Sequence, residues 1–150
     1  MTTIAWDGTW LAADRGAWSG GIRYPVRKVF KIVGQDKKPL LVAFSGDGAF
    51  ATATLEWLQG TGPHPGVYRD DKNQSPTSVA LIVDSRRRVR RLNSELKYTL
   101  VQCGRIHSSG AGQDVALGAL AAGASARKAV RIAMKFTDYA AFGVDAVRFD

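Results

Sequence analysis

The 150-residue chain contains a single cysteine, Cys103, so it cannot form an internal disulfide bond. This is typical of proteins that stay in a reducing compartment. The sequence has no apolar run as long as a membrane span, and its N-terminus lacks the basic and then apolar segments of a secretory signal. We therefore expect a cytoplasmic protein that does not associate with membranes.

Histidine is almost as scarce, with two residues in the chain. His64 lies far from Cys103 and His107, and the spacing of the three is not that of a zinc site. Cys103 and His107 would lie several residues apart on one strand, with no third member to complete a thiol-based catalytic group. We therefore expect a buried structural cysteine, and neither a metal nor a cofactor.

The length and composition fit one globular domain. A chain of 150 residues, of which 45% are apolar, can bury one substantial core but has no room for a second. We therefore expect a single domain over residues 1–150.

Basic residues outnumber acidic ones, which gives a net charge of +8 and an isoelectric point near 10.0. Much of this excess comes from the run Arg86-Arg87-Arg88-Val89-Arg90-Arg91. On a strand, Arg87, Val89 and Arg91 would share one face. The run has no interleaved aromatic residues that could stack on bases. A solvated hairpin or an intersubunit contact is therefore favoured over phosphate binding.

Periodicity and turn signals predict the element order strands, helix, strands, helices, strand. Asp7-Gly8 is a strong hairpin signal that would bring Asp14 back beside Thr2. The expected strands are residues 2–6, 9–13, 28–33, 40–44, 79–84, 89–92, 98–103 and 144–149. The expected helices are residues 49–58, 113–122 and 126–136, the last capped by Ser125. Residues 61–78 read as a long irregular loop. This order indicates an α+β fold of stacked antiparallel sheets covered by helices.

The first residues contain a candidate nucleophile, Thr2. If Met1 is removed, Thr2 becomes the first residue, and its own α-amino group can deprotonate its own hydroxyl. An α-amino group suits this role because it titrates near neutrality. Taken alone, the two threonines are explained better as the β-branched start of a strand.

Six short segments are informative through their order and spacing along the chain. They are Thr2-Thr3-Ile4, Leu11-Ala12-Ala13-Asp14, Arg27-Lys28-Val29, Ala43-Phe44-Ser45-Gly46, Ser109-Gly110-Ala111-Gly112 and Gly143-Val144-Asp145. Their order and spacing resemble the proteasome β-subunit family of N-terminal nucleophile (Ntn) hydrolases, especially the bacterial HslV type, over nearly the whole chain. The resemblance implies a four-layer α-β-β-α sandwich of two antiparallel sheets flanked by helices.

The same resemblance implies a threonine peptidase site. Thr2 matches the nucleophile, and Lys28 matches a buried lysine whose charge lowers the pKa of groups around it. Asp14 matches the carboxylate that pairs with this lysine, and the backbone N–H of Gly46 matches the oxyanion-hole donor. Without the resemblance, Asp14 and Lys28 would be read as a turn residue and a solvated strand-end charge.

Two positions depart from the family pattern. Ala111 stands where the family has a serine, and Thr137 where it has an aspartate. Ser109 and Asp138 could fill these roles near the threonine amine after a local shift in register, so both are candidate catalytic residues. The resemblance also implies pocket-lining positions at Ala17, Val26, Ala43 and Asp47.

Three functions remain open. The first is a proteasome- or HslV-like threonine peptidase acting on peptides or unfolded proteins, assembled as a homo-oligomer such as a ring and served by an ATP-dependent unfoldase. The second is a catalytically inactive relative that retains Met1 and uses the fold for assembly or binding. The third and least favoured is a nucleic-acid or acidic-partner binder that uses residues 86–91.

Overall fold

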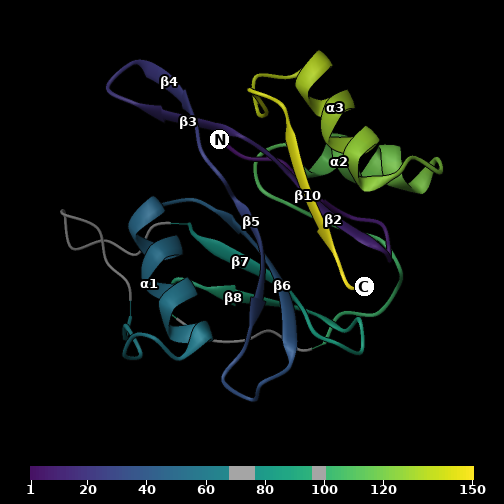
Figure 1. The fold of residues 1–150 in the computed structure, drawn as a ribbon. Helices are drawn as coiled ribbons and strands as arrows, with labels where there is room; N and C mark the ends of the chain where they lie inside the picture. The colour runs from purple at the N-terminus through teal and green to yellow at the C-terminus, as the bar shows by residue number, and fades with distance from the viewer. Residues whose placement is uncertain (68–76, 96–100) are drawn as a thin grey trace.

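The computed structural model describes residues 1–67, 77–95 and 101–150, which form antiparallel sheets and helices (Figure 1). The strands are β1 (Ile4–Trp6), β2 (Trp10–Asp14), β3 (Gly16–Ser19), β4 (Ile22–Pro25), β5 (Val29–Val33), β6 (Pro39–Ser45), β7 (Val79–Val83), β8 (Val89–Asn93), β9 (His107–Ser109) and β10 (Val144–Arg148). The helices are α1 (Gly48–Gln59), α2 (Gln113–Ala121) and α3 (Ala126–Phe136). Two four-stranded sheets have the orders β10-β2-β1-β9 and β5-β6-β7-β8, and β3 pairs with β4. The described chain therefore has the expected α+β composition with antiparallel sheets.

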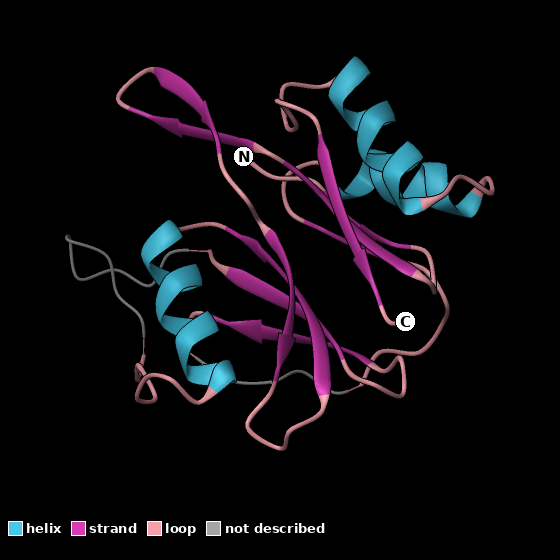
Figure 2. Ribbon diagram, viewed as in Figure 1, coloured by secondary structure: helices cyan, strands magenta, loops and turns pink. Residues whose placement is uncertain are grey.

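Apolar side chains cover both faces of the two larger sheets. The core between the sheets includes Ile4, Trp6, Leu11, Val29, Leu41, Leu81 and Val83. Phe50 and Leu58 of α1 pack on the outer face of the β5–β8 sheet. Leu120 of α2 and Val130 of α3 pack on the outer face of the other sheet. The helices thus lie on the two outer sides with the strands between them (Figure 2).

Helix boundaries follow capping chemistry. The Asp47 side chain accepts a hydrogen bond from the Ala49 N–H at 2.7 Å and starts α1. α1 ends at Gly60, which has the left-handed φ of +76° that glycine adopts without strain. Ser125 caps α3 as predicted, accepting from the Lys128 N–H. The Ser125 cap was predicted from the sequence, and the helix limits agree with the predicted ones to within one residue.

Three short strands escaped the sequence prediction. β3 and β4 form a hairpin around Gly20 and Gly21, both with positive φ, and it projects away from the sheets in Figure 1. β4 is exposed along its whole length, so it has no apolar alternation to reveal it. β9 is only three residues long. Of the predicted strand 98–103, residues 98–100 lie outside the described residues, as does the 68–76 part of the predicted loop 61–78. Cys103 is exposed, so the prediction of a buried cysteine was wrong.

Three side chains of the arginine run have different partners. Arg87 donates to the Gly8 carbonyl, and Arg88 forms an ion pair with Asp84 at 2.7 Å. Arg91 is half-buried and donates to the Ser108 carbonyl at 2.6 Å. These three side chains therefore point to different neighbours, and the nucleic-acid alternative stays a prediction. None of the helices in the described part of the chain is long and apolar enough to cross a membrane.

Candidate active site

Lys28 lies at the centre of a buried polar cluster at the N-terminus. Its Nζ atom is 3.0 Å from Thr2 Oγ1 and 3.0 Å from the Met1 carbonyl oxygen. The same atom donates to both carboxylate oxygens of Asp14, at 3.0 and 3.2 Å. The predicted Thr2, Asp14 and Lys28 therefore meet, with the lysine between the hydroxyl and the carboxylate.

Strand pairing explains this meeting. The hairpin of β1 and β2 pairs Ile4 with Ala13, which sets Asp14 beside Thr3. Lys28 directly precedes β5, and its carbonyl accepts from the Phe44 N–H of β6. Each functional residue is thus held at the end of a hydrogen-bonded strand, where the backbone fixes its position.

Asp14 is fully buried, with 0% of its surface exposed, and it is saturated with donors. The backbone N–H groups of Thr3, Gly16 and Ala141 donate to it at 2.9, 2.9 and 3.1 Å, in addition to Lys28. These bonds offset the cost of burying the charge. Asp14 therefore orients Lys28 and also ties the strand ends to the loop after α3. The Ala141 N–H had no signal in the sequence, because any residue could supply it.

Burial lowers the pKa of Lys28, and the charge and hydrogen bond of Asp14 only partly oppose this effect. The pKa of the α-amino group of Met1 is also lowered, first by burial and then by the Lys28 charge, with Asp14 acting in the opposite direction. The Met1 amine is therefore biased toward its neutral, basic form. This is the form that a proton acceptor needs.

Gly46 lies beside Thr2 at the start of the turn between β6 and α1. Its φ is +102°, and a Cβ here would meet Ser78, including the backbone Cα of that residue at 2.7 Å. The Ser78 Oγ accepts from the Asp47 N–H at 3.0 Å and so holds the turn. Glycine is therefore required at this position both by its conformation and by the close packing.

The two serines of β9 face opposite sides of the sheet. Ser109 pairs with Ile4, whose side chain lies in the core between the sheets, and borders a hollow with Thr2. Ser108 pairs with Ala5 on the helix side, and its Oγ donates to the Gln113 carbonyl at 2.8 Å. Of the two, Ser109 is therefore the serine on the side of the nucleophile.

Asp138 lies on the exposed part of the loop after α3. Main-chain groups of the same loop contact the N-terminus: the Tyr139 carbonyl accepts from Thr3 Oγ1 at 2.9 Å, and the Ala141 N–H binds Asp14. The structure thus brings the Asp138 loop to the site through its backbone, with the Asp138 side chain outside the cluster.

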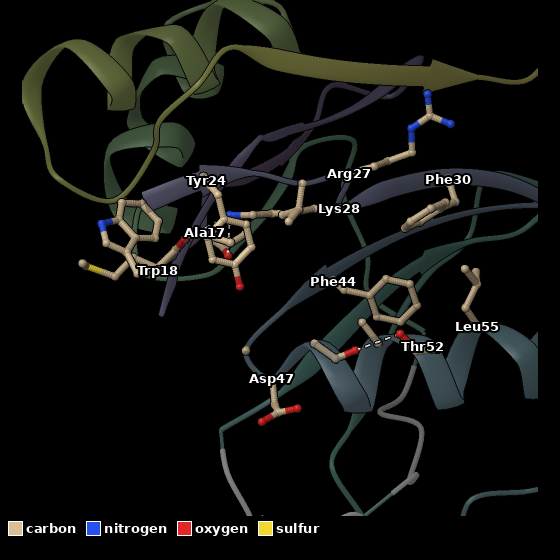
Figure 3. Close-up of a pocket in the computed structure, with 17 residues that line it drawn as sticks. Ala17, Trp18, Tyr24, Arg27, Lys28, Phe30, Phe44, Asp47, Thr52 and Leu55 are labelled. Carbon is tan, nitrogen blue, oxygen red and sulfur yellow. Dashed lines mark hydrogen bonds between the residues drawn. The ribbon is translucent and has the colours of Figure 1, made fainter. Parts of the chain in front are cut away.

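A first hollow of about 390 Å³ opens on one side of Thr2 and Gly46 (Figure 3). Its walls are largely aromatic and aliphatic: Trp18, Tyr24, Phe30, Phe44, Ala51 and Leu55. Phe30 and Phe44 meet edge to face with ring centroids 6.1 Å apart. Ala17, Val26 and Asp47 line it as expected, whereas Ala43 is buried in the core between the sheets. Such walls suit an apolar side chain.

A second hollow of about 440 Å³ also borders Thr2 and Gly46. Ser45, Thr77, Arg91, Ser109, Gly110 and Gln113 are among its lining residues. Sequence reasoning did not select Arg91. The signal was present in the strand alternation, which put Arg91 on the same face as Val89, and Val89 is buried.

Comparison with known proteins finds no matching protein-family model and no matching curated protein. Solved structures do match. Thiobacillus denitrificans BPH in complex with epoxomicin is 17% identical, with a TM-score of 0.69 over 99% of this chain and 97% of that chain. HslV from Trypanosoma brucei is 17% identical, with a TM-score of 0.66 over 98% of each chain. The chain has the proteasome-type Ntn hydrolase fold.

A third match agrees with this assignment. Anbu from Pseudomonas aeruginosa, solved as a helical assembly, is 10% identical, with a TM-score of 0.69 over 99% of this chain and 81% of that chain. The predicted resemblance to proteasome β-subunits and HslV is therefore confirmed for the fold. At these identities the likeness establishes the proteasome-type fold, and the chemistry of the site depends on its own residues.

Proposed function

We propose that the chain is a threonine peptidase in which removal of Met1 makes Thr2 an N-terminal nucleophile. The observation that carries the proposal is that one buried ammonium, Lys28 Nζ, is 3.0 Å from both Thr2 Oγ1 and Asp14 Oδ1. We further propose that residues 1–150 form one domain with the four-layer α-β-β-α arrangement of this fold. The three apolar clusters, one between the sheets and one under each helical side, support it.

The proposed reaction assigns one role to each group. The Thr2 α-amine takes the proton of the Thr2 hydroxyl as its Oγ attacks the peptide carbonyl. The Lys28 charge stabilises the alkoxide character that develops at Oγ, and the Gly46 N–H stabilises the oxyanion. The protonated amine then gives its proton to the leaving amine as the peptide C–N bond breaks, and water hydrolyses the resulting ester. Ser109 is proposed to support the amine during these transfers, whereas the exposed Asp138 side chain is given no part in them.

Removal of Met1 decides whether the proposed peptidase is active. With Met1 attached, the Thr2 nitrogen is part of a peptide bond and cannot act as a base, and the Met1 carbonyl occupies one hydrogen bond of Lys28. This observation favours the alternative proposal, a catalytically inactive assembly or binding protein, for any molecule that retains Met1. The Met1 side chain is exposed, at 54%, which supports its access to an aminopeptidase.

The partners we propose follow from the same assignment. Peptides or unfolded proteins would be the substrates, the chain would assemble as a homo-oligomer such as a ring, and an ATP-dependent unfoldase would deliver substrate in the cytoplasm. The helical assembly of Pseudomonas aeruginosa Anbu supports a tendency of this fold to oligomerise.

The test combines mass determination with activity. We expect the intact mass of the purified protein to lack Met1, and we expect an electrophilic peptide probe to label Thr2. Thr2→Ala should abolish both labelling and peptide hydrolysis. The matched control is Thr52→Ala, which changes a threonine that lines the first hollow and should keep labelling of Thr2. Full peptide hydrolysis by Thr2→Ala would contradict the proposed peptidase function, and a retained Met1 would favour the inactive alternative.

A further inference from the structure

Ser78 is a buried serine that lies directly behind Gly46. It precedes β7, with 2% of its surface exposed, and Gly46 follows β6. Ser45 and Val79 form the last pair of the ladder between these two strands. Gly46 and Ser78 are the next residues beyond this pair, and a Cβ on Gly46 would meet the Ser78 Cα at 2.7 Å. The backbone of Gly46 therefore packs directly on Ser78.

The Ser78 hydroxyl restrains one side of Gly46. Its Oγ accepts a hydrogen bond from the Asp47 N–H at 3.0 Å. This N–H belongs to the peptide group that follows Gly46, so the bond restrains the ψ angle of the glycine. Glycine loses more conformational freedom on folding than any other residue, and Gly46 has a φ of +102°. The hydroxyl therefore helps to hold Gly46 in one backbone conformation.

The sheet restrains the other side of Gly46. The Gly46 N–H belongs to the peptide group that follows Ser45, and Ser45 is held in β6 by its pairing with β7. The ladder and the Ser78 hydroxyl thus fix the peptide groups on the two sides of the glycine. Together they set the direction in which the Gly46 N–H points.

The start of α1 is held independently of Ser78. The Asp47 carboxylate accepts from the Ala49 N–H at 2.7 Å and caps the helix. Loss of the Ser78 hydroxyl should therefore loosen the turn at Gly46 and leave α1 formed.

We propose that Ser78 is a positioning residue that directs the Gly46 N–H toward the carbonyl oxygen of a peptide at Thr2. Gly46 and Thr2 border the same two hollows, whereas Ser78 lines neither of them and acts through the Gly46 backbone. This inference rests on the proposed function, in which the Gly46 N–H stabilises the oxyanion. Preorganised donors of this kind act on the transition state, so Ser78 should affect kcat more than KM.

The kinetic test compares Ser78→Ala with Ser125→Ala. Both changes remove a hydroxyl that accepts from a backbone N–H, and Ser125 does so at the start of α3. We expect Ser78→Ala to lower kcat about ten- to hundredfold with KM nearly unchanged, and Ser125→Ala to keep both values. Ser78→Thr keeps a hydroxyl and should retain more of kcat. Ser78→Cys, whose sulfur is a weak acceptor of similar size, gives the same comparison if Ser78→Ala does not fold.

A change of substrate distinguishes positioning from a general loss of structure. In a peptide thionoester, sulfur replaces the reacting carbonyl oxygen and accepts hydrogen bonds only weakly. Ser78→Ala should therefore lower kcat less for the thionoester than for the matched ester. Equal losses for the two substrates, or an unchanged kcat for both, would overturn the positioning role and leave the peptidase standing.

A backbone measurement separates this inference from the proposed function. In nuclear magnetic resonance of the full chain, Ser78→Ala should speed hydrogen exchange of the Asp47 N–H and lower the order parameter of Gly46. Ser125→Ala should change neither value. Unchanged values in Ser78→Ala would overturn the positioning role whether or not the protein cleaves peptides. Changed values in a protein that cleaves nothing would support the restraint of Gly46 by Ser78 and contradict the peptidase.

Discussion

The two sides of Thr2 differ in burial and in hydrogen bonding. On one side, Lys28 and Asp14 are buried, and Lys28 Nζ forms direct hydrogen bonds of 3.0 to 3.2 Å to Thr2 Oγ1 and to the Asp14 carboxylate. On the other side, Ser109 borders an open hollow, and Asp138 is exposed. The hydrogen bonds of the charge pair are formed while Met1 is present, whereas the Thr2 nitrogen that Ser109 is proposed to support is still part of a peptide bond.

This difference separates folding from catalysis. The charge pair is held by strand pairing, so removing one member should cost stability as well as activity. In the proposed peptidase the Ser109 hydroxyl contributes only after Met1 is removed, so deleting this hydroxyl should lower the rate with little effect on unfolding. The comparison of the two sides can therefore be tested by measuring unfolding and turnover in the same variants.

The largest effect should come from Lys28→Met. This change leaves the Asp14 carboxylate buried without its cation, and we expect a loss of about 3–5 kcal/mol in the free energy of unfolding and of all peptidase activity. The double variant Lys28→Met with Asp14→Asn removes both charges and should be more stable than the single variant. Urea unfolding checks both values, and a double variant less stable than Lys28→Met would contradict the pairing.

A smaller effect should follow Gly110→Ala, on the amine side. The φ of Gly110 is +89°, and a Cβ there would collide with the backbone carbonyl of Thr2. Strain and overpacking together should cost about 2–4 kcal/mol and displace Thr2. Gly118→Ala is the matched control, because Gly118 lies inside α2 with nothing within 4 Å of its Cβ position. That variant should gain about 1 kcal/mol from helix propensity. Equal unfolding midpoints for the two variants would contradict the packing argument.

The pH dependence of stability should also report on the charge pair. Because burial lowers the pKa of Lys28 in the folded state, the unfolded chain binds more protons between this lowered pKa and the ordinary lysine value. The Lys28 contribution to the free energy of unfolding should therefore rise with pH across that window, by at most about 1.4 kcal/mol per pH unit. Below the lowered pKa the penalty is complete and constant. Urea unfolding gives the free energy of unfolding of the wild-type protein and of Lys28→Met across alkaline pH. The difference between the two curves should isolate this rise, and parallel curves would refute it.

The sequence predicted the charge pair better than its surroundings. Asp7-Gly8 predicted the hairpin that returns Asp14 to the N-terminus, and the start of β5 placed Lys28. These local signals, turn chemistry and strand alternation, placed each residue at a strand end, and the pairing of Lys28 with Asp14 was implied only by the family resemblance.

The remainder of the site depends on contacts that no local signal encodes. The Ala141 N–H reaches Asp14 across 127 residues, and backbone donors have no side-chain signature. The exposed hairpin of β3 and β4 supplies Trp18 and Tyr24 to the first hollow without apolar alternation. For Asp138 the sequence placed an acid one residue from the family position, and the loop conformation then directed it to solvent.

The smallest and most selective effect should distinguish the two serines of β9. Ser109→Ala removes a hydroxyl from the second hollow, and we expect kcat to fall about tenfold, with KM and the unfolding midpoint nearly unchanged. Ser108→Ala removes the hydrogen bond to the Gln113 carbonyl on the helix side, so it should cost about 1 kcal/mol of stability and leave kcat unchanged. Steady-state kinetics and urea unfolding of both variants test this contrast. The reverse pattern would contradict the assignment of Ser109 and would assign the role at the amine to Ser108.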